Sequence, residues 1–243
     1  MDVLFYTQLI KYICFLKTQI LAYILNIETA TKNCSVSVAK DGEIVAITEL
    51  NESGFSHAEK LHQFISDVIN QANITFSNLK AIAVSKGPGS YTGLRIGVSA
   101  AKGLCFALDI PLISVNTLQS LAESVIISEG YKIPMLDARR MEVYSAVYDE
   151  QNNLKEDVTA TIISEDSFLN FLEKNTVYFF GDGADKCKEI LTHKNAIFID
   201  NKFPSAKEMG KLSYLKYKKS DIENVAYFEP FYLKDFMVTT SKK

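Results

Sequence analysis

Short runs of apolar residues separated by turn residues open the regular part of the chain. Residues 23–30, 34–40 and 43–50 are rich in Ile, Val and other strand-forming residues and predict three β-strands. Asp41-Gly42 separates the last two runs, and this dipeptide is a strong signal for a tight hairpin turn. This part of the fold is therefore predicted to contain three antiparallel strands.

A helical spacing of apolar residues replaces this pattern after residue 55. Ser56 and Glu59 form the sequence signature of a capping box, which marks the first turn of a helix. The apolar positions that follow recur every three or four residues, as in an amphipathic helix. They are Leu61, Phe64, Ile65, Val68, Ile69 and Ala72. We therefore predict a helix from Ser56 to Ala72.

A buried strand and a second helix come next. Residues 79–85 are apolar without alternation, as expected for a parallel strand covered on both faces, and residues 111–115 repeat that pattern. Between them we predict a helix from Thr92 to Leu108. Small residues along this helix allow another helix to approach closely. They are Gly97, Ala100, Ala101 and Gly103.

The second half of the chain repeats this order of elements. After a helix in 116–126, the pattern predicts strands at 133–138, 142–149 and 158–163, a helix at 166–173, a strand at 176–181, a helix from Ala184 and a strand at 196–199. Three strands, a helix, a strand and a helix thus occur twice. We predict a duplicated α/β fold of two lobes with mixed sheets, residues 23–116 and 117–243.

The first 22 residues differ from the rest. They are apolar and aromatic, but Lys11 and Lys17 interrupt them, so no run reaches the ~18 residues of a membrane span. Asp2 stands where a signal peptide would be positive. We favour an extension translated from an upstream start codon, with a membrane-surface anchor as the alternative.

The composition argues against several classes of function. The chain has 26 basic and 29 acidic residues and a net charge of -3, so it lacks the broad positive field that binds nucleic acid alone. Four cysteines are scattered without CxxC spacing, which argues against disulfides or zinc and fits a reducing cytoplasm. His57 and His62 are five residues apart, not the four that place two metal ligands on one helical face.

A glycine-rich loop precedes the second predicted helix and could hold a phosphate on free backbone N–H groups. Its residues are Gly87, Pro88, Gly89, Ser90, Thr92, Gly93 and, in the helix, Arg95. The spacing fits neither a Walker A loop nor a dinucleotide fingerprint. A purely structural turn is an equally weighted alternative. A second glycine turn, Gly181 and Gly183, encloses Asp182, whose charge would repel phosphate, so a tight turn is favoured there.

Taken together, several segments resemble the TsaB (YeaZ) family of tRNA threonylcarbamoyladenosine biosynthesis subunits, from about Tyr23 to Lys234. These segments are 24–45, 57–65, 86–105, 111–122, 136–148 and 229–234. The resemblance implies a two-lobed actin-like ATPase fold of the sugar kinase, heat-shock and actin superfamily. It also implies a cytoplasmic, non-catalytic partner of a TsaD-type catalytic paralogue, in a complex with a TsaE-type P-loop ATPase.

At two places this chain lacks the residues with which the catalytic paralogue and the superfamily kinases bind a metal or a nucleotide. Where the catalytic paralogue has a metal-binding HxxxH, this chain has Thr117 and Leu121, neither of which ligates iron or zinc as imidazole does. The first turn carries Glu28, Ala30 and Thr31, where superfamily kinases have Asp and Gly. Glu28, Gly181 and Gly183 are the candidate nucleotide-binding residues. We expect no metal and no cofactor.

Asp137 and Arg139, in the motif Leu136–Arg140, also match the family. An ion pair between them at the surface end of a strand is the simplest interpretation.

The predicted function is therefore a subunit that supports the catalytic paralogue, with tRNA held indirectly through the complex and no membrane contact. The two helices of the first lobe would form the interface, which we also expect to pair with a second copy when the paralogue is absent. The interface candidates are His57, Leu61, Phe64, Val68, Gly97, Ala101 and Leu104. The alternatives are a phosphotransferase or nucleotide-binding ATPase of the same fold, and a metallopeptidase-like protein, which the missing histidine pairs disfavour.

Overall fold

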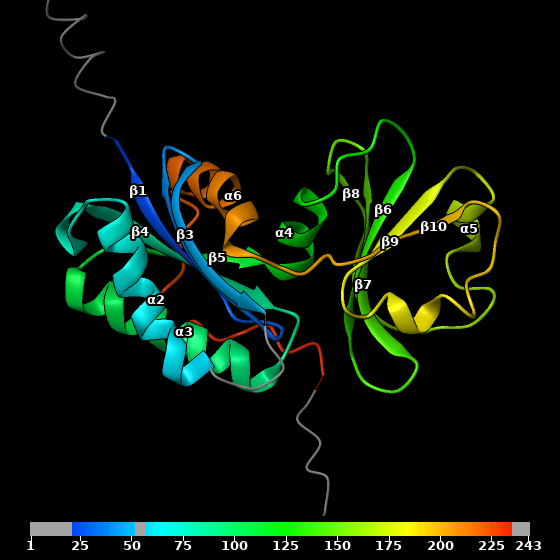
Figure 1. Ribbon diagram of the computed structural model, residues 1–243, viewed down its shortest axis with the longest axis horizontal. Helices are drawn as coiled ribbons and strands as arrows, with labels where there is room; N and C mark the ends of the chain where they lie inside the picture. Colours follow the sequence, from blue (N-terminus) through cyan, green and yellow to red (C-terminus); the bar gives the residue numbers. More distant parts are fainter. Residues whose placement is uncertain (1–20, 52–56, 235–243) are drawn as a thin grey trace, which may run out of the picture.

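The computed structural model describes residues 21–51 and 57–234, which form two lobes side by side (Figure 1). The first lobe contains a five-stranded sheet in the order β3-β2-β1-β4-β5. Its strands are β1 (Tyr23–Glu28), β2 (Asn33–Lys40), β3 (Glu43–Asn51), β4 (Leu79–Gly87) and β5 (Leu112–Asn116). Antiparallel pairing joins β1, β2 and β3, while β4 and β5 run parallel to β1.

The second sheet repeats this arrangement in the order β10-β9-β6-β7-β8. Its strands are β6 (Tyr131–Asp137), β7 (Glu142–Asp149), β8 (Leu154–Ile162), β9 (Val177–Phe180) and β10 (Ala196–Ile199). Again three strands pair antiparallel and two are parallel to the first of them. The two-lobed fold with duplicated mixed sheets, predicted from the order of elements, is confirmed.

Helices cover both faces of the first sheet (Figure 1). On one face lie α2 (His57–Gln71) and α3 (Tyr91–Leu108), whose apolar side chains join the core that includes Leu25, Val36 and Val84. On the other face lies α6 (Ala206–Lys218), which buries Met209 against Ile24. Figure 1 shows α6 and α4 (Thr117–Glu123) between the two sheets, and α4 packs on the second sheet.

The remaining helical segments are short. The sequence predicted a helix at 166–173, and the structure has a single turn, α5 (Leu169–Leu172). The helix predicted from Ala184 is a short 3₁₀ segment, Asp185–Cys187, because its amides bond three residues back, as Cys187 N–H does to Ala184. Another 3₁₀ turn, Phe76–Asn78, precedes β4.

The end of the described chain returns to the first lobe, which differs from the predicted assignment of 117–243 to the second lobe. Helix α6 packs on the first sheet, and Glu223 then pairs with Leu112 at the free edge of β5. Further on, Phe231 N–H donates to the carbonyl of Lys86 at 2.7 Å. Apolar contacts decide this assignment, because Ala206 and Met209 of α6 pack in one buried cluster with residues of the first sheet such as Ile113.

Turn residues behave as their sequence indicated at the β2–β3 hairpin, where Asp41 and Gly42 have φ values of 53° and 93°. The predicted capping residue Ser56, and residues 1–20 of the N-terminal extension, lie outside the described residues. Within the described ranges, no helix has both the length and the apolar character needed to cross a bilayer.

Candidate functional site

The glycine-rich loop packs tightly against the turn between β1 and β2. A Cβ atom on Gly89 would lie 2.4 Å from the carbonyl oxygen of Ala30, and one on Gly93 would lie 2.1 Å from that of Thr29. Ser90 N–H donates to Ala30 at 2.6 Å, and the Ser90 hydroxyl caps α3 by accepting from Gly93 N–H at 3.3 Å. These contacts favour the structural interpretation of the loop over a phosphate cradle.

Of the other residues in this loop motif, some are buried and some are exposed. Gly87 and Pro88 are buried, whereas Thr92 is exposed at the start of α3. Arg95 is exposed too: its guanidinium lies 4.2 Å from the centre of the Tyr91 ring, and its Nε donates to the hydroxyl of Tyr232 at 3.3 Å. Arg95 thus connects α3 to the C-terminal segment.

Glu28 is fully buried at the end of β1. Burial raises the pKa of its carboxyl to about 7, although hydrogen bonds from Ala30 N–H and the Ser85 hydroxyl counteract the rise. The Oε2 atom has no hydrogen-bond partner in the structure as described. Within the described ranges, no group of three or more acidic, His or Cys side chains converges as metal ligands. This geometry suits a carboxyl that holds a proton near neutral pH better than one that holds a cation.

In the second glycine turn, two backbone amides donate hydrogen bonds to carbonyls of the chain itself. Gly183 N–H donates to the carbonyl of Met135, and Ala184 N–H donates to that of Gly181, both at 3.1 Å. Asp182 between them is largely buried, which raises its pKa, and its Oδ1 accepts from Asp137 N–H at 3.2 Å. The turn therefore joins β6 to the segment after β9, and these two amides are not free to hold a phosphate.

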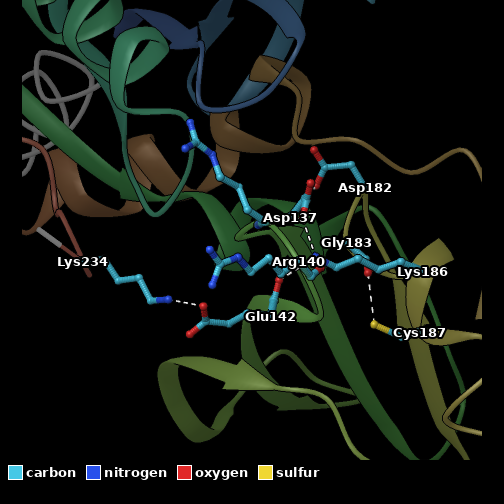
Figure 2. A network of polar contacts seen from close by, with 9 residues as sticks. Asp137, Arg140, Glu142, Asp182, Gly183, Lys186, Cys187 and Lys234 are labelled. Carbon is cyan, nitrogen blue, oxygen red and sulfur yellow. Dashed lines mark hydrogen bonds and ion pairs between the residues drawn. The ribbon is translucent and has the colours of Figure 1, made fainter. Parts of the chain in front are cut away.

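A network of polar contacts surrounds the turn between β6 and β7 (Figure 2). Lys186 forms an ion pair with Asp137 and donates to the carbonyls of Arg140 at 2.6 Å and Glu142 at 2.7 Å. The predicted ion pair between Asp137 and Arg139 is wrong. Arg139 contacts that carboxylate only through its backbone N–H, at 2.9 Å, because the turn directs the amide toward Asp137 and Lys186 supplies the cation.

The interface predicted on α2 and α3 requires a correction. Six of its seven candidates are buried in the chain's own first lobe: His57, Leu61, Phe64, Val68, Gly97 and Ala101. Leu61, Phe64, Val68 and Ala101 belong to the core between these helices and the sheet. Gly97 lies directly over Thr29, whose Oγ1 would be 2.2 Å from an added Cβ. An apolar stripe marks whichever face is buried, and here the sheet buries it.

A groove does exist on the outer side of these helices. Its volume is about 550 Å³, and it includes Leu104, the one predicted interface residue that faces outward. The lining residues are Ala58, His62, Arg95, Ile96, Ser99, Ala100, Gly103 and Leu104. Ala100 and Gly103 belong to the small residues that the sequence singled out for close helix approach. A Cβ on Gly103 would have no heavy-atom neighbour within 4 Å, so the groove is open there.

The two positions compared with a metal-binding histidine pair lie on α4. Thr117 and Leu121 are both fully buried, and the Thr117 hydroxyl has no hydrogen-bond partner in the described structure. Leu121 belongs to the apolar cluster between α4 and the second sheet. The packing of α4 uses these side chains as core.

Comparisons with known proteins agree with this architecture. A family model described as TsaD, tRNA N6-adenosine threonylcarbamoyltransferase, matches residues 51–241. The chain is 26% identical over 223 residues to the tRNA threonylcarbamoyladenosine biosynthesis protein TsaB of Haemophilus influenzae, covering 87% of this chain and 93% of that protein. It is 30% identical over 198 residues to the protein of that name in Buchnera aphidicola subsp. Schizaphis graminum, covering 76% and 90%.

A solved structure described as YeaZ from Pseudomonas aeruginosa superposes with a TM-score of 0.75 at 23% identity. The match covers 88% of this chain and 100% of that one. At this identity the likeness bears on the fold alone, and it agrees with the two duplicated lobes described above.

Proposed function

The chain belongs to the TsaB (YeaZ) family of tRNA threonylcarbamoyladenosine biosynthesis proteins, and we propose that it is a non-catalytic partner subunit that docks on a TsaD-type paralogue. In this proposal the paralogue transfers the threonylcarbamoyl group to adenosine beside the anticodon, and a TsaE-type ATPase works in the same cytoplasmic complex. The tRNA is held mainly through the complex.

The observation that carries this proposal is the open groove between α2 and α3. Small side chains at Ala58, Ser99, Ala100 and Gly103 let a second helix come close, and Ile96 and Leu104 offer apolar surface. A paralogue with the same fold would present an equivalent pair of helices. The same groove would let two copies of this chain pair around a twofold axis when the paralogue is absent.

The assignment of catalysis to the paralogue rests on the chemistry of this chain's own residues. A buried threonine and a buried leucine, Thr117 and Leu121, stand where a metal would need two imidazoles. In the two glycine turns, Ser90 N–H donates to the carbonyl of Ala30 and Gly183 N–H donates to that of Met135. These features support a subunit that positions its partner, in preference to phosphotransfer or metal-dependent hydrolysis.

The direct test is threonylcarbamoyladenosine formation on unmodified tRNA, supplied with threonylcarbamoyl-AMP and the ATPase subunit. We expect product only when this chain and the paralogue are both present. Equal product without this chain would reject the partner role, and product from this chain without the paralogue would reject its non-catalytic status.

The docking surface is tested separately with Gly103→Arg. The Cβ of the added side chain would meet no heavy atom within 4 Å, so we expect normal folding by circular dichroism and loss of association in gel filtration. Gln151→Arg, exposed in the turn after β7, is the matched control and should leave association unchanged. Normal binding by Gly103→Arg would show that the paralogue docks elsewhere. Gly97→Arg is unsuitable because it would disrupt the contact with Thr29.

A further inference from the structure

The turn between β6 and β7 holds two adjacent arginines in a backbone conformation that L residues rarely adopt. Arg139 and Arg140 have φ values of 69° and 51°. Such left-handed residues cost roughly 1–2 kcal/mol each, so two in succession persist only where surrounding contacts hold them. The turn is therefore held in place by its neighbours.

Lys186 and Asp137 supply that support (Figure 2). The Lys186 ammonium reaches the carbonyls of Arg140 and Glu142 and the Asp137 carboxylate, and Asp137 also accepts from Arg139 N–H. All of these bonds engage the backbone of the turn or the side chains of its neighbours. The arginine side chains take no part in them.

The guanidinium groups of both arginines are therefore not used to hold the turn. Arg139 and Arg140 are exposed, and across residues 21–51 and 57–234 neither side chain has a hydrogen bond or ion pair. The nearby acids are already occupied: Asp137 pairs with Lys186, Glu142 pairs with Lys234, and Asp182 accepts a backbone N–H. The turn thus carries two positive charges that no acidic side chain among the described residues neutralises.

The use of arginine here is itself informative. Only three of the 26 basic residues are arginine, and two of the three are adjacent in this turn. Lysine would supply the same charge, but the planar guanidinium alone offers two parallel N–H donors that match the oxygens of a phosphate. An anchored pair of free guanidiniums is suited to bind phosphate groups.

We propose that Arg139 and Arg140 contact the phosphate backbone of the tRNA. This inference rests on the proposed function for the identity of the nucleic acid. RNA backbone is favoured over a nucleotide because the amides of Gly183 and Ala184, which follow Asp182 beside this turn, are bonded to carbonyls. Phosphates here are met by exposed side chains alone, which is how proteins commonly contact nucleic-acid backbone. Burial raises the pKa of Asp182, and the exposed Lys32 partly counteracts that rise electrostatically, so a further cation lies near this turn.

The test is binding of tRNA to the double variant Arg139→Asn/Arg140→Asn, followed by fluorescence anisotropy. Asparagine tolerates the left-handed conformation, so the backbone of the turn is preserved. The matched control is Lys218→Gln/Lys219→Gln, which removes two adjacent exposed cations at the end of α6. Each protein is titrated alone at low ionic strength and again as the assembly with the paralogue.

We expect the arginine variant to bind tRNA about tenfold more weakly or worse. The slope of log affinity against log salt concentration should become shallower by about one for each phosphate contact that is lost. The lysine control should bind like the wild type. Single variants at each position should lose part of the affinity, and circular dichroism should show that all of them fold.

Unchanged tRNA affinity of the arginine variant would overturn the inference. So would equal weakening by the lysine control, which would indicate a general charge effect, or a loss of ATP binding with tRNA binding intact. Absence of tRNA binding by the wild-type chain, alone and assembled, would overturn it as well. Failure of the proposed function is recognised separately, as a wild-type chain that neither assembles nor supports modification, while the titration of the chain alone still reports on the two arginines.

Discussion

The hydroxyl of Ser85 donates a hydrogen bond of 2.8 Å to the carboxyl of Glu28, across the buried junction of β4 and β1. The same carboxyl oxygen accepts from Ala30 N–H at 2.6 Å, while the other oxygen has no partner in the described structure. A neutral carboxyl is easier to bury in this way than a charged one. The pKa of about 7 expresses that preference.

Glu28 should make stability depend on pH. Its folded pKa of about 7 lies above the ordinary value of 4.5, so the folded state holds the proton more tightly than the unfolded chain. The resulting stabilisation is fully present below pH 4.5 and is lost as pH rises through 7, about 3 kcal/mol in all. Denaturant titrations of the wild type and Glu28→Gln between pH 5 and 8 measure it.

We expect Glu28→Gln to lose that slope, whatever its absolute stability, because glutamine has no proton to release. Ser35→Ala, beside Glu28 on β2, is a control for disturbance of this buried region and should retain the slope. An unchanged slope in Glu28→Gln would mean that another group causes it.

Two glycines of α3 should respond in opposite directions to alanine. At Gly93 the new Cβ would lie 2.1 Å from the Thr29 carbonyl, so backbone must move and stability should fall by about 2 kcal/mol or more. At Gly103 the Cβ meets nothing, and the higher helix propensity of alanine should add about 1 kcal/mol. Thermal unfolding of the two variants checks both signs, and stabilisation of Gly93→Ala would contradict the close packing of the loop on β1.

Lys186→Met should loosen the turn between β6 and β7. The substitution keeps much of the side-chain volume but removes the ion pair to Asp137 and two hydrogen bonds to carbonyls, at a cost of about 2 kcal/mol to the second lobe. Hydrogen exchange should accelerate at residues 138–142 and not in α2. If exchange there matches the wild type, other contacts hold the left-handed residues in place.

Most strands could be predicted from the sequence because a strand's pattern of apolar and turn residues lies within a few neighbouring positions. Strand β7 (Glu142–Asp149) and strand β10 (Ala196–Ile199) have the predicted bounds, since apolar runs between turn residues define them. Helix α6 was not predicted, although Ser205 and Glu208 have the spacing of a capping box, and the Ser205 hydroxyl caps the helix by accepting from Lys207 N–H.

The site residues were harder to predict because burial in the fold and burial in a complex leave the same pattern. Leu61, Phe64 and Val68 form an apolar stripe that could face a partner or a sheet, and only the three-dimensional contacts distinguish the two. The free guanidinium of Arg139 was missed for a related reason. Its sequence neighbour Asp137 is an obvious partner, but the actual partner of that acid, Lys186, is 49 residues away.

The return of α6 to the first lobe has a consequence for synthesis of the protein. Strands β1 to β5 are complete at Asn116, but the helix that covers their second face begins 90 residues later, at Ala206. At about 5 to 20 residues per second, a ribosome needs roughly 5 to 20 s to bridge that interval. Until then Ile24, Ile113 and Val115 lie on an uncovered sheet face of the nascent chain. The first lobe is thus the first to begin synthesis and the last to be completed. Its uncovered sheet face is a natural substrate for chaperones during translation.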